Sequence, residues 1–310
     1  MYLLNVTIRV SEVKENDRLH EWLIVRNELE PEDPLLFEQL LARRAAEPQR
    51  VELIAASEDD IVAIGSVGPK GSPPDLAYGY IGVRDGAKNL GAEVALLDTV
   101  RERARELGRS RLELWAREED DYFIALLNEH GFREVMRERG LARDIPGAPL
   151  MVVPRPEGIT LENVEGRADL GDGAYDVAHE TWRDIPGETG IEEREAWLSL
   201  HVDGAAGGAI VALHEEQVIG FAGLHQLAVE GLYEHGLLAV LPQYRRSGVA
   251  RAMKLAQLAW LNDHDAHRVV TWNSETNHAA RALNLSLGYQ PLLSSIAFHG
   301  PVWHAPEEIS

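Results

Sequence analysis

An internal repeat is the feature that most constrains the fold of this chain. When the numbering is shifted by 157 residues (248 − 91 = 157), Gly91 falls on Gly248 and Trp115 falls on Trp272. The register holds without a gap from position 83 to position 132, and it also pairs Val83 with Val240, Lys88 with Arg245, Glu118 with Glu275, Gly131 with Gly288 and Phe132 with Tyr289. A gapless register of this length indicates a tandem duplication.

The length of the chain and the position of its proline- and glycine-rich segment agree with two domains. A chain of 310 residues suits two domains of ordinary size. The densest run of proline and glycine lies between Pro146 and Gly158, so we predict domains at 1–150 and 151–310. Each half mixes short strands with helices, and this order predicts an α/β (α+β) fold in which a mixed, mostly antiparallel sheet is flanked by helices.

A short turn in the second half has the character of an anion site. The apolar run that ends at Leu241 is followed by Pro242, and helical apolar spacing resumes from Arg251. Free backbone N–H groups at the start of that helix, on the positive end of its dipole, are suited to a phosphate. Small residues let a bulky anion approach the backbone of this turn, which reads Arg245, Arg246, Ser247, Gly248, Val249, Ala250.

The residues around this turn resemble a known enzyme superfamily. A second strand, Asn273, Asn277 and a helix ending in Gly288-Tyr289 follow the turn, and together they resemble the GNAT superfamily of acetyl-coenzyme A-dependent N-acetyltransferases. The tandem architecture resembles that of mycothiol synthases. The resemblance implies that residues 245–251 bind the diphosphate of acetyl-coenzyme A. It also implies that Asn273 and Asn277 touch the coenzyme and that the backbone N–H groups of Leu238, Ala239 and Val240 polarise the thioester; Arg251 completes the turn.

Two residues are candidates for the chemistry. Glu234 lies eleven residues before Arg245 (245 − 234 = 11), where several members of the superfamily carry a base glutamate. Alternation places Glu234 on the face of Gly236 and Leu238, with His235 on the opposite face; the alternative is a solvated carboxylate at the strand end. Asn284 stands where many members have a tyrosine acid, and an amide cannot act as an acid. The sequence therefore leaves the general acid open, with water or an unprotonated thiolate as the alternatives.

The resemblance implies that the loop between the first two helices of the second domain, Trp182 to Glu188, covers the acceptor. Trp182 is placed to stack on an acceptor, and Asp184 to hold its ammonium group. A buried aromatic and a helix cap are the alternative interpretations of these two residues.

The first copy of the turn differs at positions that matter for a polyanion. Glu93 replaces Ala250, Asp120 replaces Asn277 and Asn89 replaces Arg246 in the repeat register. A carboxylate beside a diphosphate repels it. We therefore expect the first domain to have lost coenzyme binding and to shape or cover the substrate site.

Composition excludes several classes of function. The chain has no cysteine, so it has no disulfide and no cysteine-based zinc site, and we expect no metal. A net charge of −21 disfavours nucleic acid as a partner. Without an apolar run near 18 residues or a secretory signal, we expect a soluble, cytoplasmic, bacterial monomer or homodimer with no membrane partner. The expected function is acetyl transfer from acetyl-coenzyme A to a primary amine of a small molecule; the alternative is a noncatalytic acyl-coenzyme A sensor.

Overall fold

The computed structural model describes residues 7–58, 60–71, 73–88, 90–145, 155–185, 190–191, 193–203 and 207–303. The chain forms two compact units, of which unit 1 comprises 1–137 with 295–310 and unit 2 comprises 138–294. This division differs from a cut after residue 150, because each repeat gives the end of its last strand to the other unit. Of the predicted boundary segment, residues 146–154 lie outside the described residues.

Unit 1 is a mixed sheet covered by helices. Across its sheet the strands follow the order β1 (Ile8–Glu12), β2 (Val51–Ser57), β3 (Asp60–Pro69), β4 (Leu76–Val83), β5 (Arg111–Arg117) and the end of β12 (Gln290–Pro301). Only β4 and β5 run parallel within this order. The helices are α1 (Asn16–Leu29), α2 (Phe37–Ala46), η1 (Asp85–Ala87, a 3₁₀ turn), α3 (Ala92–Glu106) and α4 (Asp121–Glu129).

Unit 2 repeats this plan. Its strands follow the order β6 (Arg133–Asp144, from Glu138 onward), β11 (Arg268–Ser274), β10 (Leu232–Val240), β9 (Gln217–Gln226), β8 (Ile210–His214) and β7 (Ile159–Asn163). Only the β10 and β11 pair runs parallel. The helices are α5 (Ala168–Thr181), η2 (Trp182–Asp184, a 3₁₀ turn), α6 (Arg194–Leu198), η3 (Ser199–Asp203, a π turn), η4 (Pro242–Tyr244, a 3₁₀ turn), α7 (Val249–Asp263) and α8 (His278–Ser286).

The repeat register survives in the structure residue by residue. Helix α3 begins at Ala92 and α7 at Val249 (249 − 92 = 157), and the bounds of η1 and η4, β5 and β11, α4 and α8, and β6 and β12 show the same offset. Both α3 and α7 begin after a glycine in the left-handed region, Gly91 with φ 84° and Gly248 with φ 92°. A residue with a β-carbon disfavours that conformation, so both copies need glycine at this position.

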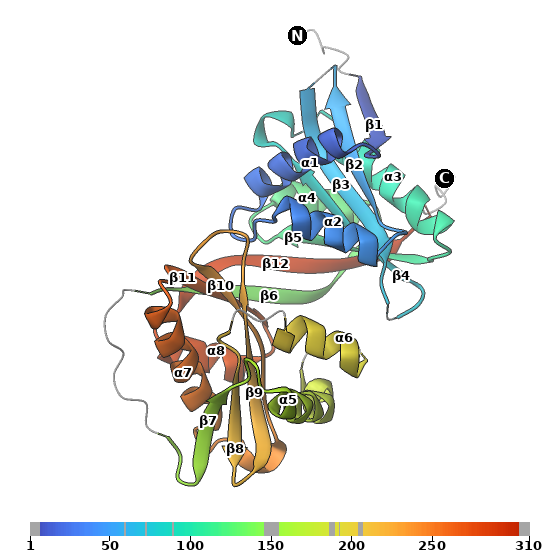
Figure 1. Cartoon of the computed structure of the whole chain (residues 1–310). Coiled ribbons are helices and arrows are strands. Elements are labelled where there is room, and N and C mark those ends of the chain that lie inside the picture. The colour runs from blue at the N-terminus through green and yellow to red at the C-terminus, as the bar shows by residue number, and fades with distance from the viewer. Residues whose placement is uncertain are drawn as a thin grey trace. The chain divides into compact units, whose positions relative to one another are not determined.

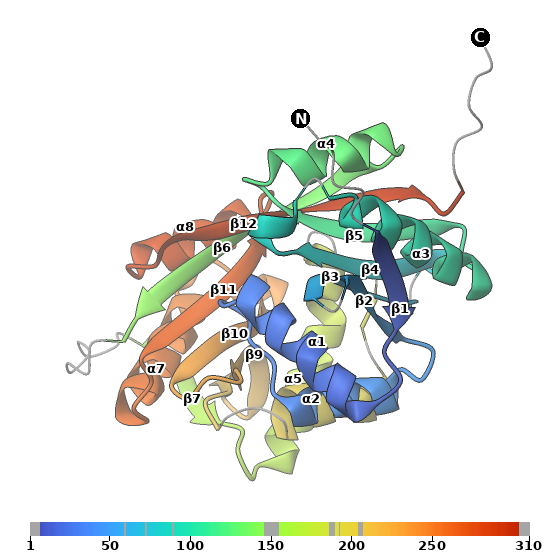
Figure 2. The same ribbon diagram turned by 90° about the horizontal axis from the view of Figure 1, so that it is seen from above.

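Helices cover both faces of each sheet, as the alternation of the strands requires. In unit 1, Leu53 and Ala55 pack with α3 and α4, whereas Ile54 between them packs with α1 and α2. Figure 1 shows α1 and α2 over one face of β2 and β3. In unit 2, Val211 packs with residues of α5 and α6, whereas Ala212 packs with residues of α7. Figure 2 shows α7 and α5 on either side of β9. The predicted fold of two mixed, helix-flanked sheets is confirmed.

One helical segment of unit 2 changes its form along its length. Helix α6 covers Arg194–Leu198 and then widens into the π turn η3. Trp197 is the buried anchor of this segment, and it packs edge-on against Phe221 of β9 with ring centroids 5.2 Å apart. No helix in the described part of the chain has both the length and the apolar character required to cross a bilayer.

Candidate active site

A cavity of 470 Å³ opens in unit 2 where two neighbouring strands separate. β10 and β11 pair only from Leu232 opposite Arg268 to Glu234 opposite Val270, although both strands continue beyond these residues. On the other side, β10 stays paired with β9, but its register slips between His235 and Leu238. A β-bulge of this kind bends a strand and re-aims its groups. The gap between β10 and β11 therefore exposes backbone and side chains of β10 to a ligand.

Glu234, the predicted base, lines this cavity. It is the last residue of β10 that pairs with β11. His235 lines it as well, although alternation predicted that His235 would face away. The difference arises because the cavity lies at the edge of β10, where the strand has lost its partner, so five consecutive residues from Glu234 to Leu238 form the wall. Of the three backbone donors named from the sequence, only Leu238 lines the cavity; Ala239 and Val240 belong to the buried core.

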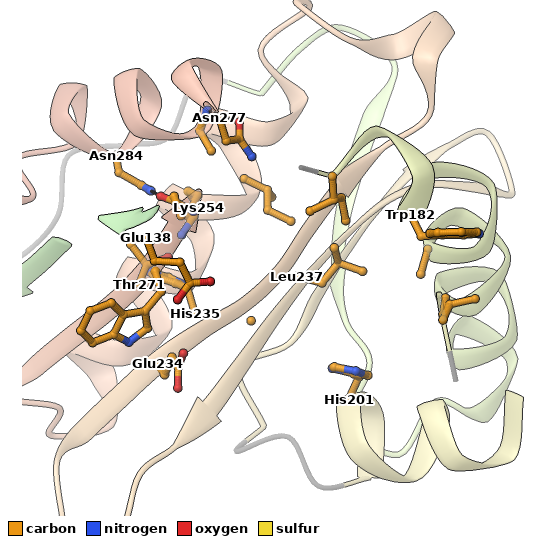
Figure 3. A pocket seen from close by; sticks show the side chains of 18 of the residues that line it. Glu138, Trp182, His201, Glu234, His235, Leu237, Lys254, Thr271, Asn277 and Asn284 are labelled. Carbon is orange, nitrogen blue, oxygen red and sulfur yellow. Dashed lines mark hydrogen bonds between the residues drawn. The ribbon is translucent and has the colours of Figure 1, made fainter. Parts of the chain in front are cut away.

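Polar groups from several elements share one side of the cavity. Figure 3 shows Glu138, Glu234, His235, Lys254, Thr271 and Asn284 together, across from Trp182 and His201. Trp182, the candidate for stacking on an acceptor, lines the cavity from η2. The three predicted asparagines, Asn273, Asn277 and Asn284, also line the cavity. Asn284 donates to Oδ1 of Asn273 at 2.9 Å, and the side chain of Asn277 caps α8 by accepting from the N–H of Ala280 at 3.2 Å.

A buried cluster lies behind the polar wall. The ring Nε2 of His235 shares a short hydrogen bond with the hydroxyl of Tyr289. Burial, and then the nearby charge of Lys254, hold the pKa of His235 well below its ordinary value, so the ring is neutral near pH 7. Burial also lowers the pKa of Lys254 to about 7. The site therefore contains a titratable lysine beside a histidine that does not titrate in the same range.

The predicted anion turn lies at the start of α7, outside the cavity lining. Arg245, Arg246, Ser247, Gly248 and Arg251 are exposed, whereas Val249 is buried in the core. Arg246 and Gly248 both have a positive φ, of 60° and 92°, so the chain between η4 and α7 is sharply folded. An ideal β-carbon on Gly248 would meet nothing nearer than Pro156 at 3.7 Å, which leaves open space above the turn. Open space over an exposed helix start suits a large anion.

Side chains within the turn already have partners. Ser247 donates to the carbonyl of Tyr244 at 2.6 Å, and Arg251 donates to the hydroxyl of Ser286 at 2.9 Å. Asp184 does not line the cavity; its carboxylate instead pairs with Arg245 at 2.7 Å. The structure thus brings together two residues that the sequence assigned to different ligands. The remainder of that predicted cover, residues 186–188, lies outside the described residues.

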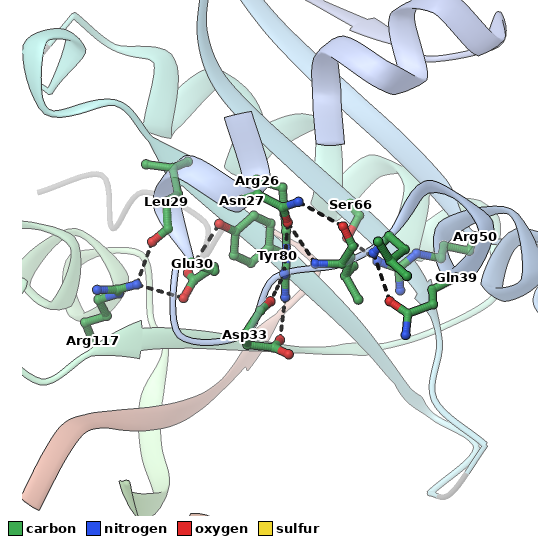
Figure 4. Close-up of polar contacts among 12 residues, drawn as sticks. Arg26, Asn27, Leu29, Glu30, Asp33, Gln39, Arg50, Ser66, Tyr80 and Arg117 are labelled. Carbon is green, nitrogen blue, oxygen red and sulfur yellow. Dashed lines mark hydrogen bonds and ion pairs between the residues drawn. The ribbon is translucent and has the colours of Figure 1, made fainter. Parts of the chain in front are cut away.

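The corresponding region of unit 1 is occupied by its own side chains. β4 and β5 also stop pairing early, after Tyr78 opposite Glu113. Beyond that point the hydroxyl of Tyr80 donates to Glu30 at 3.3 Å, and Arg117 donates to the same carboxylate at 2.9 Å (Figure 4). Burial, and then the charge of Glu30, raise the pKa of the Tyr80 hydroxyl. The gap that is open in unit 2 is thus occupied in unit 1 by Tyr80 and Arg117, which both donate to Glu30.

The turn of unit 1 is also neutralised internally. Lys88, the counterpart of Arg245, lies 3.2 Å from Asp85 and 3.6 Å from Asp120, the counterpart of Asn277. Glu93, the counterpart of Ala250, is buried under the turn with 2% exposure. Asn89 lies outside the described residues. This arrangement places two carboxylates where an entering diphosphate would need positive charge.

Sequence reasoning missed Lys254 and Glu138. The sequence did contain a signal for Lys254, because this lysine shares a helical face with Leu258 and Leu261, where a charged residue is unexpected. The sequence contained no such signal for Glu138. This residue belongs to the first repeat by sequence, and it lies in unit 2 because β6 pairs with β11.

Comparison with known proteins agrees with the geometry. The acetyltransferase (GNAT) family model matches residues 16–132 and 173–289, which are again 157 residues apart (173 − 16 = 157). A mycothiol acetyltransferase from Thermomonospora curvata is 26% identical over 283 residues, which cover 87% of this chain and 89% of that protein.

Two solved structures share the fold. A GCN5-related N-acetyltransferase from Sphaerobacter thermophilus has a TM-score of 0.77 at 16% identity, covering 95% of this chain and 96% of that one. A tandem GNAT protein from the clavulanic acid biosynthesis pathway has a TM-score of 0.76 at 17% identity, covering 96% of this chain and 100% of that one. Because the family model matches most of the chain in two copies, the chain belongs to the acetyltransferase (GNAT) family and is a tandem-domain N-acetyltransferase.

Proposed function

We propose that unit 2 transfers an acetyl group from acetyl-coenzyme A to the primary amine of a small molecule. The observation that carries this proposal is the separation of β10 from β11 just after Glu234, which opens the cavity beside a strand with unpaired backbone groups. Acetyl-coenzyme A would supply an activated thioester, with its diphosphate held over residues 245–251 and its acyl end directed toward the cavity.

Glu234 is the proposed base. Its carboxylate lies at the end of the paired region, beside the unpaired part of β10, where an acceptor nitrogen can approach a thioester. An amine must lose a proton as it attacks, and a positioned carboxylate can accept that proton. The backbone N–H groups near the bulge, from Leu237 onward, would stabilise the negative charge that develops on the carbonyl oxygen.

The acceptor side of the cavity is aromatic and acidic. Trp182 lines one side of the cavity, and Glu138 and Glu234 lie across from it (Figure 3). An aromatic wall and carboxylates favour a cationic amine. Since the relative from Thermomonospora curvata is named a mycothiol acetyltransferase, the amine precursor of mycothiol belongs in the first panel of acceptors. We further propose that the enzyme works in the bacterial cytoplasm as a monomer or homodimer.

A thiol-release assay with acetyl-coenzyme A and a panel of primary amines tests the proposal. We expect turnover by the wild type, and a loss of about 100-fold in kcat for Glu234→Gln with the acidic limb of the pH profile removed. Glu230→Gln, four residues earlier at an exposed position in the same segment, is the matched control and should keep wild-type activity. Tight coenzyme binding without thiol release from any acceptor would favour the sensor function instead.

Calorimetry tests the location of the coenzyme. An Arg245→Ala/Gly248→Val double variant should lose acetyl-coenzyme A binding, because it removes a cation and places a side chain on a left-handed residue over the helix start. The matched double variant in unit 1, Lys88→Ala/Gly91→Val, should bind as the wild type does. Binding of ordinary strength by the first double variant would show that unit 2 is not the coenzyme site.

A further inference from the structure

Lys254 is a buried cation in the wall of the cavity. The fold itself does not use this cation. The residue is 3% exposed, and it lines the cavity from α7. Its ammonium lies 5.6 Å from the centroid of the Tyr289 ring. In the part of the chain that the structure describes, its Nζ makes neither a hydrogen bond nor an ion pair. A buried ammonium whose three donors are unspent is costly to the folded protein, so a ligand that accepts from it would be favoured.

The groups around Lys254 come from every neighbouring element. β10 contributes Glu234 and His235, β6 contributes Glu138, and Tyr289 lies immediately before β12. α8 contributes the uncharged Asn284. Burial disfavours the charged ammonium and favours the neutral amine. Burial lowers the pKa of Lys254 to about 7, so both forms are populated in the neutral range.

Other candidates for donating a proton are less suitable. The hydroxyl of Tyr289 is bonded to His235, and burial raises its pKa. The ring of His235 is kept neutral by burial and by the charge of Lys254. Asn284 donates its amide to Asn273 and has no acidic proton to give. Compared with Tyr289, His235 and Asn284, Lys254 is better suited to hold and release a proton near neutral pH, because burial lowers its pKa to about 7.

The position of Lys254 relative to the turn indicates which atom it faces. Lys254 lies six residues after Gly248 on α7 (254 − 248 = 6), which corresponds to about 9 Å along the helix. A coenzyme held at the turn and extended into the gap between β10 and β11 would reach the cavity that Lys254 lines from α7. Glu234 lines the same cavity from β10 (Figure 3). In this arrangement the lysine and the carboxylate would reach the reacting thioester from two different elements.

We propose that Lys254 is the general acid that protonates the sulfur of coenzyme A as the thioester breaks. This role rests on the proposed function of unit 2. The acceptor nitrogen forms a C–N bond with the acetyl carbon and gives a proton to Glu234. The C–S bond breaks, sulfur leaves with the electron pair and takes a proton from Nζ of Lys254. Proton transfer from Glu234 to the neutral lysine through cavity water restores both groups, so an amine and acetyl-coenzyme A yield an amide and coenzyme A.

The pH profile of kcat tests the proposal on the full-length chain. In the wild type, kcat should fall as the pH rises above about 7, because the acid loses its proton. Lys254→Met should lower kcat about 100-fold at pH 7 and remove this alkaline limb, while the acidic limb of Glu234 and the dissociation constant of acetyl-coenzyme A stay within twofold of wild type. Circular dichroism and thermal unfolding establish that the variant is folded.

A second variant separates proton donation from charge. Lys254→Arg keeps a positive charge but cannot release a proton in this range, so it should bind coenzyme and remain as slow as Lys254→Met. Full activity of Lys254→Arg, or an alkaline limb that persists in either folded variant, would overturn the role of Lys254. If Lys254→Met does not fold, Lys254→Gln takes its place. Failure of the wild type to acetylate any amine would instead overturn the proposed function itself.

Discussion

Arg245 donates from Nη2 to Oδ2 of Asp184 at 2.7 Å, and from Nε to the carbonyl of Val240 at 2.9 Å. The second contact fixes the guanidinium at the end of β10, beside the start of α7. The first contact neutralises it with a carboxylate from the segment after α5. An arriving diphosphate would therefore compete with Asp184 for the same cation.

Removing that competitor should strengthen coenzyme binding. Both side chains are about half exposed, so their ion pair is weak and contributes less than about 1 kcal/mol. We expect Asp184→Asn to lower the dissociation constant of acetyl-coenzyme A up to about fivefold, measured by calorimetry at low salt. Asp172→Asn, which breaks a comparable exposed pair with Arg194, is the control and should leave the constant unchanged. Weaker binding by Asp184→Asn would mean that Asp184 positions Arg245 for the coenzyme.

Lys254 also predicts how stability depends on pH. Its pKa in the folded protein is lowered to about 7, whereas the unfolded chain keeps the ordinary value near 10.5. Between these values the unfolded state binds more protons, so the stability of the wild type rises with pH in this window. Below about pH 7 the lysine is charged in both states, and the full cost of its burial remains.

Lys254→Met should therefore be more stable than the wild type at pH 7, by up to a few kcal/mol, and this advantage should shrink toward pH 10. Urea unfolding of the two proteins at pH 6, 7, 8.5 and 10 measures the difference. A difference that does not change with pH would mean that the lysine titrates alike in both states. Because this measurement involves no substrate, it tests the pKa of Lys254 independently of catalysis.

The two units should differ in coenzyme binding. In unit 1, Lys88 lies near Asp85 and Asp120, and Tyr80, Glu30 and Arg117 fill the place where β4 leaves β5. We expect one molecule of acetyl-coenzyme A per chain in calorimetry, and we expect Lys88→Ala to leave both the stoichiometry and the affinity unchanged. Two equivalents bound by the wild type, with one lost in Lys88→Ala, would show that unit 1 is a second site.

The sequence predicted the repeated parts of the fold well because their signals are local. The glycines that precede α3 and α7, Gly91 and Gly248, and the alternation of the strands are each encoded within a few residues. Glu234 and Trp182 were named as site candidates from their places in a strand and in a loop, and both line the cavity. The remainder depends on contacts between distant segments. The wall position of Glu138 follows from strand pairing across the repeats, and that of His235 from a gap that alternation does not show.

The exchange of strands predicts the behaviour of a cut chain. The first repeat supplies β6, whose residues 138–144 pair with β11, and the second repeat supplies β12, whose residues 295–301 pair with β5. Each compact unit therefore contains a strand that a cut after residue 150 would assign to the other fragment. Backbone pairing along whole strands, buried against packed side chains, holds such fragments together without a covalent link.

Cleavage at a protease site inserted between residues 146 and 154 should give two fragments that elute together from a sizing column and separate only in denaturant. Each fragment expressed alone should aggregate or remain unfolded, because its sheet lacks the edge partner supplied by the other. The uncut chain with the same insertion is the control for any effect of the inserted sequence. If the cut fragments separate in native buffer and each gives a cooperative unfolding transition, then each repeat folds on its own strands and the exchange of β6 and β12 is wrong.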